Sequence, residues 1–400
     1  MKIAVNIARI IVGLLFIFSG LVKANDPLGL SYKMQEFFEV WGLHGFNSIT
    51  LPMSVFMNAF EIIAGTALLI GWRIRLFSWL LLLLIVFFTF LTGYTYVTGK
   101  PTNCGCFGDC LPLTSKSSFL KDIFLLILIG LIFWKQKFIK PFLSEKLNII
   151  KMVSVTIFSF GLQWYTLTYL PIVDCLPFKK GNNISEKMKV PANAIPDSTV
   201  ITFVYNKNGQ EVEFTADKFP ADFNSTDYSL VKRYDRVIRK GKNNEPPIKG
   251  FSLSGPTNED STEIVLSQPY AVLLFCEKFS VSPKKWKADF EEVYKLATLK
   301  HIPVYMITAA PGEALEVIEG TGFSDIQIFK CDYKAIATAA RTDPCLFFLK
   351  KGTVLGKWSY HRMGNVIPNI NNIQESEMLP PPPPKMPEDT IVEDSTTMEQ

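Results

Sequence analysis

The sequence predicts a membrane α-helical bundle of about five spans followed by an outer α/β domain, and three observations support this fold class. The first half contains five long apolar stretches, whereas the charged residues are concentrated in the second half. From about residue 250 onward, short apolar stretches typical of strands alternate with amphipathic stretches typical of helices. The mean hydropathy of +0.19 and the 48% of hydrophobic residues fit a chain divided between membrane and water.

The five apolar stretches are long enough to cross a bilayer, which takes roughly 20 residues for about 30 Å of hydrocarbon. They lie near residues 3–22, 52–71, 76–98, 117–134 and 148–170. The first stretch lacks an Ala-x-Ala cleavage site and is followed by further spans, so we expect a retained helix rather than a signal peptide.

Basic residues between the stretches predict the orientation. With the N-terminus inside, two loops that carry basic residues fall on the cytoplasmic side, as the positive-inside rule requires. These residues are Arg73 and Arg75 in one loop and Lys135, Lys137, Lys140 and Lys146 in the other. We therefore expect a multi-pass protein of a bacterial inner membrane, in contact with the lipid bilayer, whose chain after about residue 171 is periplasmic. The net charge of +4 is too small to indicate nucleic-acid binding.

Three cysteines, Cys104, Cys106 and Cys110, lie close together between the third and fourth apolar stretches. We call residues 104–110 the cysteine loop. By the predicted topology all seven cysteines of the chain face the periplasm, where disulfides form. Because seven is an odd number, at least one thiol stays unpaired or pairs transiently.

The cysteine loop has three interpretations. The first is a reversible thiol–disulfide site. The second is a fixed structural disulfide, formed either between Cys106 and Cys110 or with Cys175. The third is a metal site. We predict no metal, because three thiolates need a fourth ligand and no histidine lies near. A Cys-x-Cys disulfide closes a small ring, and strained disulfides are the labile kind. This favours exchange by Cys104 and Cys106, with Cys110 or Cys175 as the resolving partner.

Two charged residues, one in each of the first two predicted spans, have chemical weight of their own. Glu61 falls near the middle of the second span, where a lone carboxylate costs a few kcal/mol unless it is protonated or paired. Arg9, about two turns into the first span, is the nearest predicted partner. The pair is either a structural ion pair or a site that handles protons or a quinone cofactor. We expect Lys23 to extend to the membrane interface.

The second half begins with a polar, proline-dotted linker over 182–198 and a hairpin over 199–215 around Asn208-Gly209. Residues 216–249 give no clear periodic signal. The α/β pattern then predicts strands at 271–276, 302–308, 326–330, 345–350 and 353–358, with helices at 283–300, 312–320 and 333–341.

This pattern resembles thioredoxin-like domains, specifically the membrane-tethered and peroxiredoxin-type branch. Phe251-Ser252-Leu253 resembles the strand that leads into that fold, and the segment from Asp343-Pro344 resembles the one that begins with a cis-proline. Ser280 and Pro283 stand where the resemblance implies the two active cysteines, so the domain is degenerate. Cys276, Cys331 and Cys345 lie near the edge implied for the active site, but buried thiols also behave as small hydrophobic residues.

Residues 5–135 resemble the DoxX and MauE group of bacterial membrane proteins. The matching residues are Arg9, the run 13–23, Glu61, Gly65, Gly71 and Cys104-Gly105-Cys106-Phe107-Gly108, of which the last favours the MauE branch. The resemblance implies periplasmic disulfide handling for MauE-type proteins, as in the maturation of methylamine dehydrogenase, and a link to quinol oxidases for DoxX-type proteins. Such a bundle joined to a thioredoxin-like domain resembles an architecture of Bacteroidetes.

We divide the chain into five parts. They are a DoxX/MauE-like bundle (1–135), a cytoplasmic basic loop with the fifth span (136–175), a linker and hairpin region (176–249), a degenerate thioredoxin-like domain (250–372) and a Pro-rich disordered tail (373–400). The five consecutive prolines at 380–384 predict an extended tail that is either a spacer or a docking peptide.

The predicted function is periplasmic thiol–disulfide exchange or electron transfer, by a thiol–disulfide oxidoreductase or a protein accessory to one. Electrons would pass to quinone in the bundle or to a periplasmic client or redox partner. The alternative is a non-catalytic envelope scaffold whose thioredoxin-like domain binds client proteins.

Overall fold

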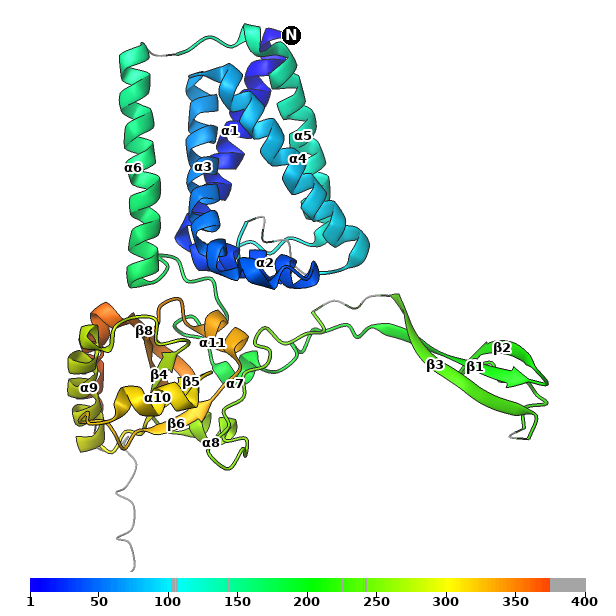
Figure 1. Ribbon diagram of the computed structural model, residues 1–400, viewed down its shortest axis with the longest axis vertical. Coiled ribbons are helices and arrows are strands. Elements are labelled where there is room, and N and C mark those ends of the chain that lie inside the picture. The colour runs from blue at the N-terminus through cyan, green and yellow to red at the C-terminus, as the bar shows by residue number, and fades with distance from the viewer. Residues whose placement is uncertain are drawn as a thin grey trace, which may run out of the picture.

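The computed structural model describes residues 1–101, 105, 107–142, 144–224, 226–239, 241 and 243–374, without the side chain of His44. Within these residues, 5 helices are long and apolar enough to cross a membrane, in agreement with the five predicted spans. Figure 1 shows these helices as a bundle, with a mixed-sheet domain below and a three-stranded arm that projects sideways.

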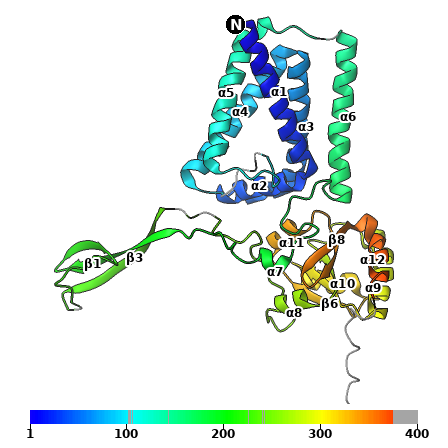
Figure 2. The ribbon, with the colours of Figure 1, turned by 180° about the vertical axis from the view of Figure 1, so that it is seen from behind.

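The bundle has an antiparallel layout in which one short helix covers an end. Its helices are α1 (Lys2–Asn25), α2 (Pro27–Val40), α3 (Thr50–Ile70), α4 (Ile74–Thr98), α5 (Ser115–Lys135) and α6 (Glu145–Tyr169). The short α2 lies across the end that faces the mixed-sheet domain (Figure 1). Seen from behind, α1 and α3 again lie side by side, as do α4 and α5, with α6 outside α3 (Figure 2).

Small residues allow α1 and α3 to approach closely. A Cβ atom at Gly65 would lie 2.8 Å from the backbone oxygen of Gly13, and one at Gly20 would lie 3.0 Å from the backbone oxygen of Asn58. Membrane helices gain packing contacts where such residues let their backbones meet. The glycines therefore set the register of α1 against α3.

Polar side chains join α6 to the other helices. Gln163 Nε2 donates to the carbonyl of Val55 at 3.0 Å, and Asn58 Nδ2 donates to Gln163 Oε1 at 3.2 Å. Thr166 Oγ1 donates to the carbonyl of Ala24 at 3.0 Å. Because an unpaired polar group in hydrocarbon is costly, these bonds fix α6 near the end of the bundle that faces the mixed-sheet domain.

The mixed-sheet domain contains five strands in the order β6-β5-β4-β7-β8. The strands are β4 (Ala271–Cys276), β5 (Val304–Thr308), β6 (Gln327–Lys330), β7 (Cys345–Lys350) and β8 (Thr353–Ser359). The first three are parallel to one another, and β7 and β8 are antiparallel to their neighbours. Its helices are α7 (Ile184–Lys187), α8 (Thr262–Ser267), α9 (Lys287–Leu299), α10 (Pro311–Ile318), α11 (Tyr333–Ala339) and α12 (Ile367–Asn371). The predicted alternation of strands and helices is therefore present.

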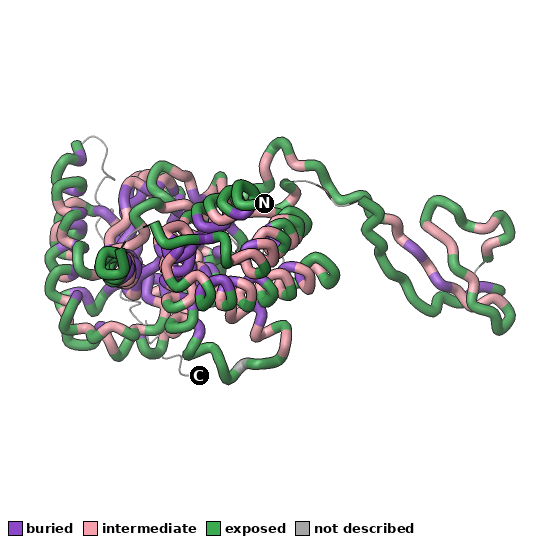
Figure 3. Tube along the Cα trace, turned by 90° about the horizontal axis from the view of Figure 1, so that it is seen from above, coloured by how far each residue is buried: buried purple, intermediate pink, exposed green. Residues whose placement is uncertain are grey.

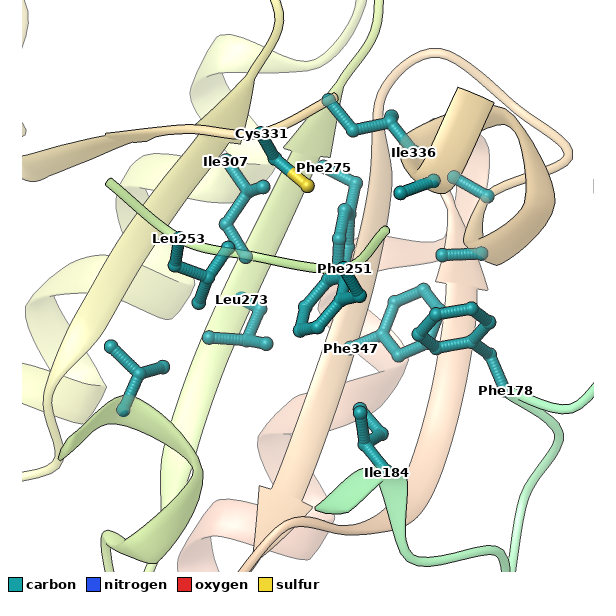
Figure 4. Packing of buried hydrophobic residues seen from close by; sticks show 14 of the residues in the cluster. Phe178, Ile184, Phe251, Leu253, Leu273, Phe275, Ile307, Cys331, Ile336 and Phe347 are labelled. Atoms are coloured by element: carbon teal, nitrogen blue, oxygen red, sulfur yellow. The ribbon is translucent and has the colours of Figure 1, made fainter. Parts of the chain in front are cut away.

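Both faces of this sheet are covered. Residues of α8 and α11 pack on one face with Phe275 and Phe347, whereas residues of α9, α10 and α12 pack on the other with Leu274 and Phe348. Strands buried on both faces read as continuous apolar runs, which is the pattern of β4 and β7. Figure 4 shows the first cluster, with Cys331 beside Ile307 and Phe275.

The arm consists of β1 (Ser198–Lys207), β2 (Gln210–Thr215) and β3 (Tyr228–Arg239) in the order β2-β1-β3. The predicted hairpin is present, with φ of 51° at Asn208 and 86° at Gly209, as its two-residue turn requires. Strand β3 was not predicted, because all of it except Tyr228 is exposed and no apolar alternation marks it. Figure 3 shows that buried residues gather in the bundle and the mixed-sheet domain rather than in the arm.

Replacing Gly65 with Ala tests the close approach of α1 and α3. The added methyl group would collide with the backbone of Gly13, so we expect the free energy of unfolding to fall by about 1–3 kcal/mol. The matched control is Gly130→Ala on α5, where a Cβ atom meets nothing within 4 Å and helix propensity improves. Thermal unfolding in detergent should separate the two variants; equal melting temperatures would contradict the packing argument.

Candidate functional site

The described part of the cysteine loop lies at the end of the bundle that faces the mixed-sheet domain. Cys110 forms a disulfide with Cys175, which follows α6; the Cα atoms are 4.9 Å apart and the two residues are 65 positions apart in the sequence. Of the pairings left open by the sequence, the structure contains the link to Cys175. Cys104 and Cys106, the predicted exchanging pair, lie outside the described residues.

The intramembrane carboxylate of Glu61 pairs with Lys23. Lys23 Nζ lies 2.6 Å from Glu61 Oε1, and the two side chains are 3% and 1% exposed. The Glu61 Oε2 atom is buried and accepts no hydrogen bond from any described residue. Lys23 Nζ also lies 4.9 Å from the centre of the Phe88 ring. Glu61 therefore keeps one oxygen atom available to a further hydrogen-bond donor or proton.

The expected pairing of Glu61 with Arg9 is wrong, and the Lys23 side chain, which was expected to extend to the membrane interface, is instead buried against Glu61. Because α1 and α3 are antiparallel, Glu61 lies beside Gly20 and Lys23, near the end of α1. Arg9 lies 14 residues earlier on α1, which is about 21 Å along the helix axis. Arg9 Nε is buried without a hydrogen-bond partner among the described residues.

The Lys23–Glu61 pair faces a cavity between α1, α2, α3, α4 and α5, which we call the bundle cavity. The cavity is partly open to the outside. Apolar side chains form most of its wall, including Phe37, Phe38, Trp41, Met53, Met57 and Phe88. Gly105 and Phe107 of the cysteine loop also line it. A cavity with apolar walls and a few convergent polar groups is typical of a ligand site.

A second ion pair lines the bundle cavity. On α5, Lys121 Nζ lies 2.8 Å from Asp122 Oδ1, and Thr92 Oγ1 of α4 donates to Asp122 Oδ2 at 3.0 Å. Lys121 Nζ lies 4.9 Å from the centre of the Phe107 ring. Sequence analysis missed this pair, although its signal was two adjacent charges inside the fourth predicted span.

In the mixed-sheet domain, the carboxylate of Asp343, a residue just before β7, binds the loop after β4 in which the resemblance implied a dithiol. Its Oδ1 accepts from the backbone N–H of Glu277 at 2.9 Å, and its Oδ2 accepts from those of Lys278 at 3.2 Å and Ser280 at 3.0 Å. The Ser280 hydroxyl donates to Oδ2 at 2.9 Å. The peptide bond from Asp343 to Pro344 is cis, as the sequence predicted. The N–H groups available to stabilise an anion here therefore already bind a carboxylate.

The three other described cysteines are buried free thiols. Burial and the charge of Asp343 raise the pKa of Cys276, and burial raises the pKa of Cys331 and that of Cys345 to about 11. Cys276 and Cys345 belong to clusters on opposite faces of the sheet. These thiols behave as core residues.

The five long apolar helices indicate a multi-pass membrane protein. Comparison with known proteins shows which families its parts resemble. Residues 1–135 match the family model described as Methylamine utilisation protein MauE, and residues 199–240, the arm, match Domain of unknown function (DUF8463). The chain is 27% identical over 179 residues to Protein TlpB of Flavobacterium psychrophilum, across 44% of this chain and 45% of TlpB. The chain thus matches less than half of that relative's length. No solved structure is significantly similar.

Replacing Lys23 with Met tests the buried ion pair. The change leaves the Glu61 carboxylate unpaired, so we expect the free energy of unfolding to fall by about 3–5 kcal/mol. The double variant Lys23→Met/Glu61→Gln should regain most of this lost stability, because no unpaired charge then remains buried at this site. The control is Lys33→Met, which breaks the more exposed Lys33–Glu36 pair and should cost at most about 1 kcal/mol. Equal losses by thermal unfolding in detergent would contradict the role of Lys23.

Burial and the raised pKa values of Cys331 and Cys345 predict slow alkylation of the folded protein. At pH 8, roughly a thousandth of either thiol would be thiolate, so N-ethylmaleimide should modify both far more slowly than in protein unfolded in urea, where the thiol pKa returns to about 8.5. Mass spectrometry of the two cysteines at pH 8 measures both rates, and equal rates in folded and unfolded protein would contradict the burial argument.

Proposed function

We propose that this chain takes part in periplasmic thiol–disulfide exchange at a bacterial inner membrane, with Cys104 and Cys106 as the exchanging pair. One observation carries the proposal: Gly105, which stands between these two cysteines in the sequence, lines the bundle cavity together with Lys23 and Glu61. The similarity of residues 1–135 to MauE supports it, since MauE-type proteins are implicated in disulfide handling.

The Cys110–Cys175 disulfide supports the periplasmic orientation. Disulfides persist in oxidising compartments such as the periplasm and are rare in the bacterial cytosol. Asp109 and Asp174, which precede its two cysteines, pair with Arg341 and Lys357 of the mixed-sheet domain, so the disulfide lies at the end of the bundle nearest that domain. The same orientation follows from the basic loops on the opposite side.

The proposed exchange conserves electrons and protons. Two thiols of a client become one disulfide, while the Cys104–Cys106 disulfide accepts two electrons and two protons to become two thiols. A client thiolate attacks a sulfur atom of the Cys104–Cys106 disulfide to form a mixed disulfide, and the second client thiolate attacks the client sulfur atom and releases Cys104 and Cys106 as thiols. A thiolate of Cys104 or Cys106 exchanges in the same way with the Cys110–Cys175 disulfide, which frees Cys110 or Cys175 as the resolving thiolate. Returning Cys104 and Cys106 to the disulfide form requires an acceptor of two electrons.

The bundle cavity fits a quinone as this acceptor. Aromatic and Met side chains suit an apolar ring and tail, and Glu61 Oε2 is a buried oxygen atom without a partner among the described residues. A bound quinone would supply the two-electron acceptor. Glu61 would hold a proton at Oε2, and Lys23 would orient the carboxylate through Oε1. Lys23 takes the role that the sequence assigned to Arg9, which is not among the described residues that line the cavity.

For the mixed-sheet domain we propose a thioredoxin-like fold without redox chemistry of its own. The strand order and the cis-proline support the resemblance. The carboxylate of Asp343, which binds the backbone of the loop after β4, and the buried thiols favour binding over catalysis. These same observations favour the alternative function, a scaffold whose domain binds client proteins.

Cysteine substitutions in the full-length protein distinguish the two functions. With the protein in quinone-containing nanodiscs, oxidation of a reduced dithiol peptide should be lost in Cys104→Ser and in Cys106→Ser. It should be retained in a Cys276→Ser/Cys345→Ser variant, which is the matched control.

If oxidation is lost in Cys276→Ser/Cys345→Ser and retained in Cys104→Ser and Cys106→Ser, the exchange takes place in the mixed-sheet domain and the proposed site is wrong. No oxidation by the unsubstituted protein, with all variants equal, would favour the scaffold.

A further inference from the structure

Each half of the Cys110–Cys175 disulfide follows an aspartate that binds the mixed-sheet domain. Asp109 precedes Cys110 and Asp174 precedes Cys175. Although the two segments are far apart in the chain, both aspartates pair with a cation of that domain. The mixed-sheet domain therefore holds the chain beside each of the two disulfide-bonded cysteines.

Arg341 provides the first of these contacts. This residue follows α11 and its side chain is only 4% exposed. Nη2 lies 3.0 Å from Asp109 Oδ2, and Nε lies 2.9 Å from both carboxylate oxygens of Asp26 at the start of α2. Nη1 donates to the carbonyl of Ala337, and the guanidinium lies 5.5 Å from the centre of the Tyr32 ring. One buried cation thus joins the domain, α2 and the cysteine loop.

Lys357 of β8 provides the second contact. Its Nζ lies 2.9 Å from Asp174 Oδ2, and its side chain is 6% exposed. The other oxygen of Asp174 accepts from the backbone N–H of Leu176 at 3.0 Å, which holds the chain just after Cys175. The ammonium also lies 5.0 Å from the centre of the Phe347 ring.

A part-buried hydrogen bond of 3.1 Å from the Tyr32 hydroxyl to Glu277 also joins α2 to the domain, whereas the remaining ion pair between them is more exposed. The Lys334–Glu39 pair has side chains 59% and 34% exposed, and Tyr333 donates to Gln35 at 3.4 Å. Exposed ion pairs contribute little, whereas removing one member of a buried pair leaves an uncompensated charge. The docked arrangement therefore depends most on Arg341 and Lys357.

We propose that Arg341 and Lys357 are positioning residues that hold the Cys110–Cys175 disulfide in place, so that docking of the mixed-sheet domain controls how readily this disulfide exchanges. Attack on a disulfide requires access of a thiolate to one of its sulfur atoms. When both aspartates are bound, the chain segments around Cys110 and Cys175 move little. When the domain undocks, these segments open locally and the sulfur atoms become accessible. Extension of this control to Cys104 and Cys106 rests on the proposed function.

The test measures reduction of the Cys110–Cys175 disulfide by dithiothreitol in the full-length protein in nanodiscs. Dithiothreitol forms its cyclic disulfide as Cys110 and Cys175 become thiols, which are trapped with a maleimide and quantified by mass spectrometry. Arg341→Gln and Lys357→Met should each raise the rate about tenfold, which corresponds to about 1.4 kcal/mol of opening free energy. Lys334→Met, which breaks only an exposed pair of the same interface, is the control and should leave the rate near that of the unsubstituted protein.

If Arg341→Gln fails to fold, Asp109→Asn tests the same ion pair by removing the charge of its partner in the bundle. Asp109 is 41% exposed, and Arg341 keeps its contacts with Asp26 in this variant. We expect faster reduction in Asp109→Asn as well. An unchanged rate in both Asp109→Asn and Lys357→Met, or an equal rise in Lys334→Met, would overturn the proposal. Because this rate does not require Cys104 or Cys106, the result stands apart from the oxidation assay of the proposed function.

Discussion

The cost of a charge inside hydrocarbon is the constraint on which the membrane half depends. Glu61 is tolerated because Lys23 lies 2.6 Å from it, and this distance requires α1 and α3 to be almost in backbone contact. Gly13, Gly20 and Gly65 provide that contact. Asp122, which also lines the bundle cavity, pairs instead with its neighbour Lys121 on α5 and accepts a hydrogen bond from Thr92 of α4. The cavity is thus apolar in its walls while carrying two charge pairs, which is a suitable surrounding for redox or proton chemistry near the cysteine loop.

Sequence patterns predicted the features that depend on local chain properties. Span length and hydropathy located the five helices, Asn208-Gly209 located a hairpin, and continuous apolar runs located the strands of the mixed sheet. The partner of Glu61 was not predictable in this way, because the register of α1 against α3 is set by where their glycines meet. The third strand of the arm was also missed, since its side chains are exposed and only its backbone is paired.

For the cysteines too, the sequence predicts what depends on local chain properties, whereas their pairing depends on tertiary structure. Composition indicated that some thiols are paired and others buried, yet the Cys110–Cys175 link joins residues 65 positions apart and stayed one of several alternatives. Cys276 and Cys345 are near one edge of the sheet, but the register of β4 with β7 pairs Cys345 with Phe275 and so directs Cys276 to the other face. Side-chain alternation, rather than distance along the chain, decides which thiols can meet.

The disulfide also changes how the chain is connected across the bilayer. It closes a covalent ring that contains α5 and α6, so the ring crosses the hydrocarbon layer twice and is completed at the end of the bundle nearest the mixed-sheet domain. The outermost helix, α6, is therefore bonded to the rest of the bundle at both of its ends. A single peptide-bond cleavage in the 136–144 connection would leave two polypeptides that remain one molecule until the disulfide is reduced.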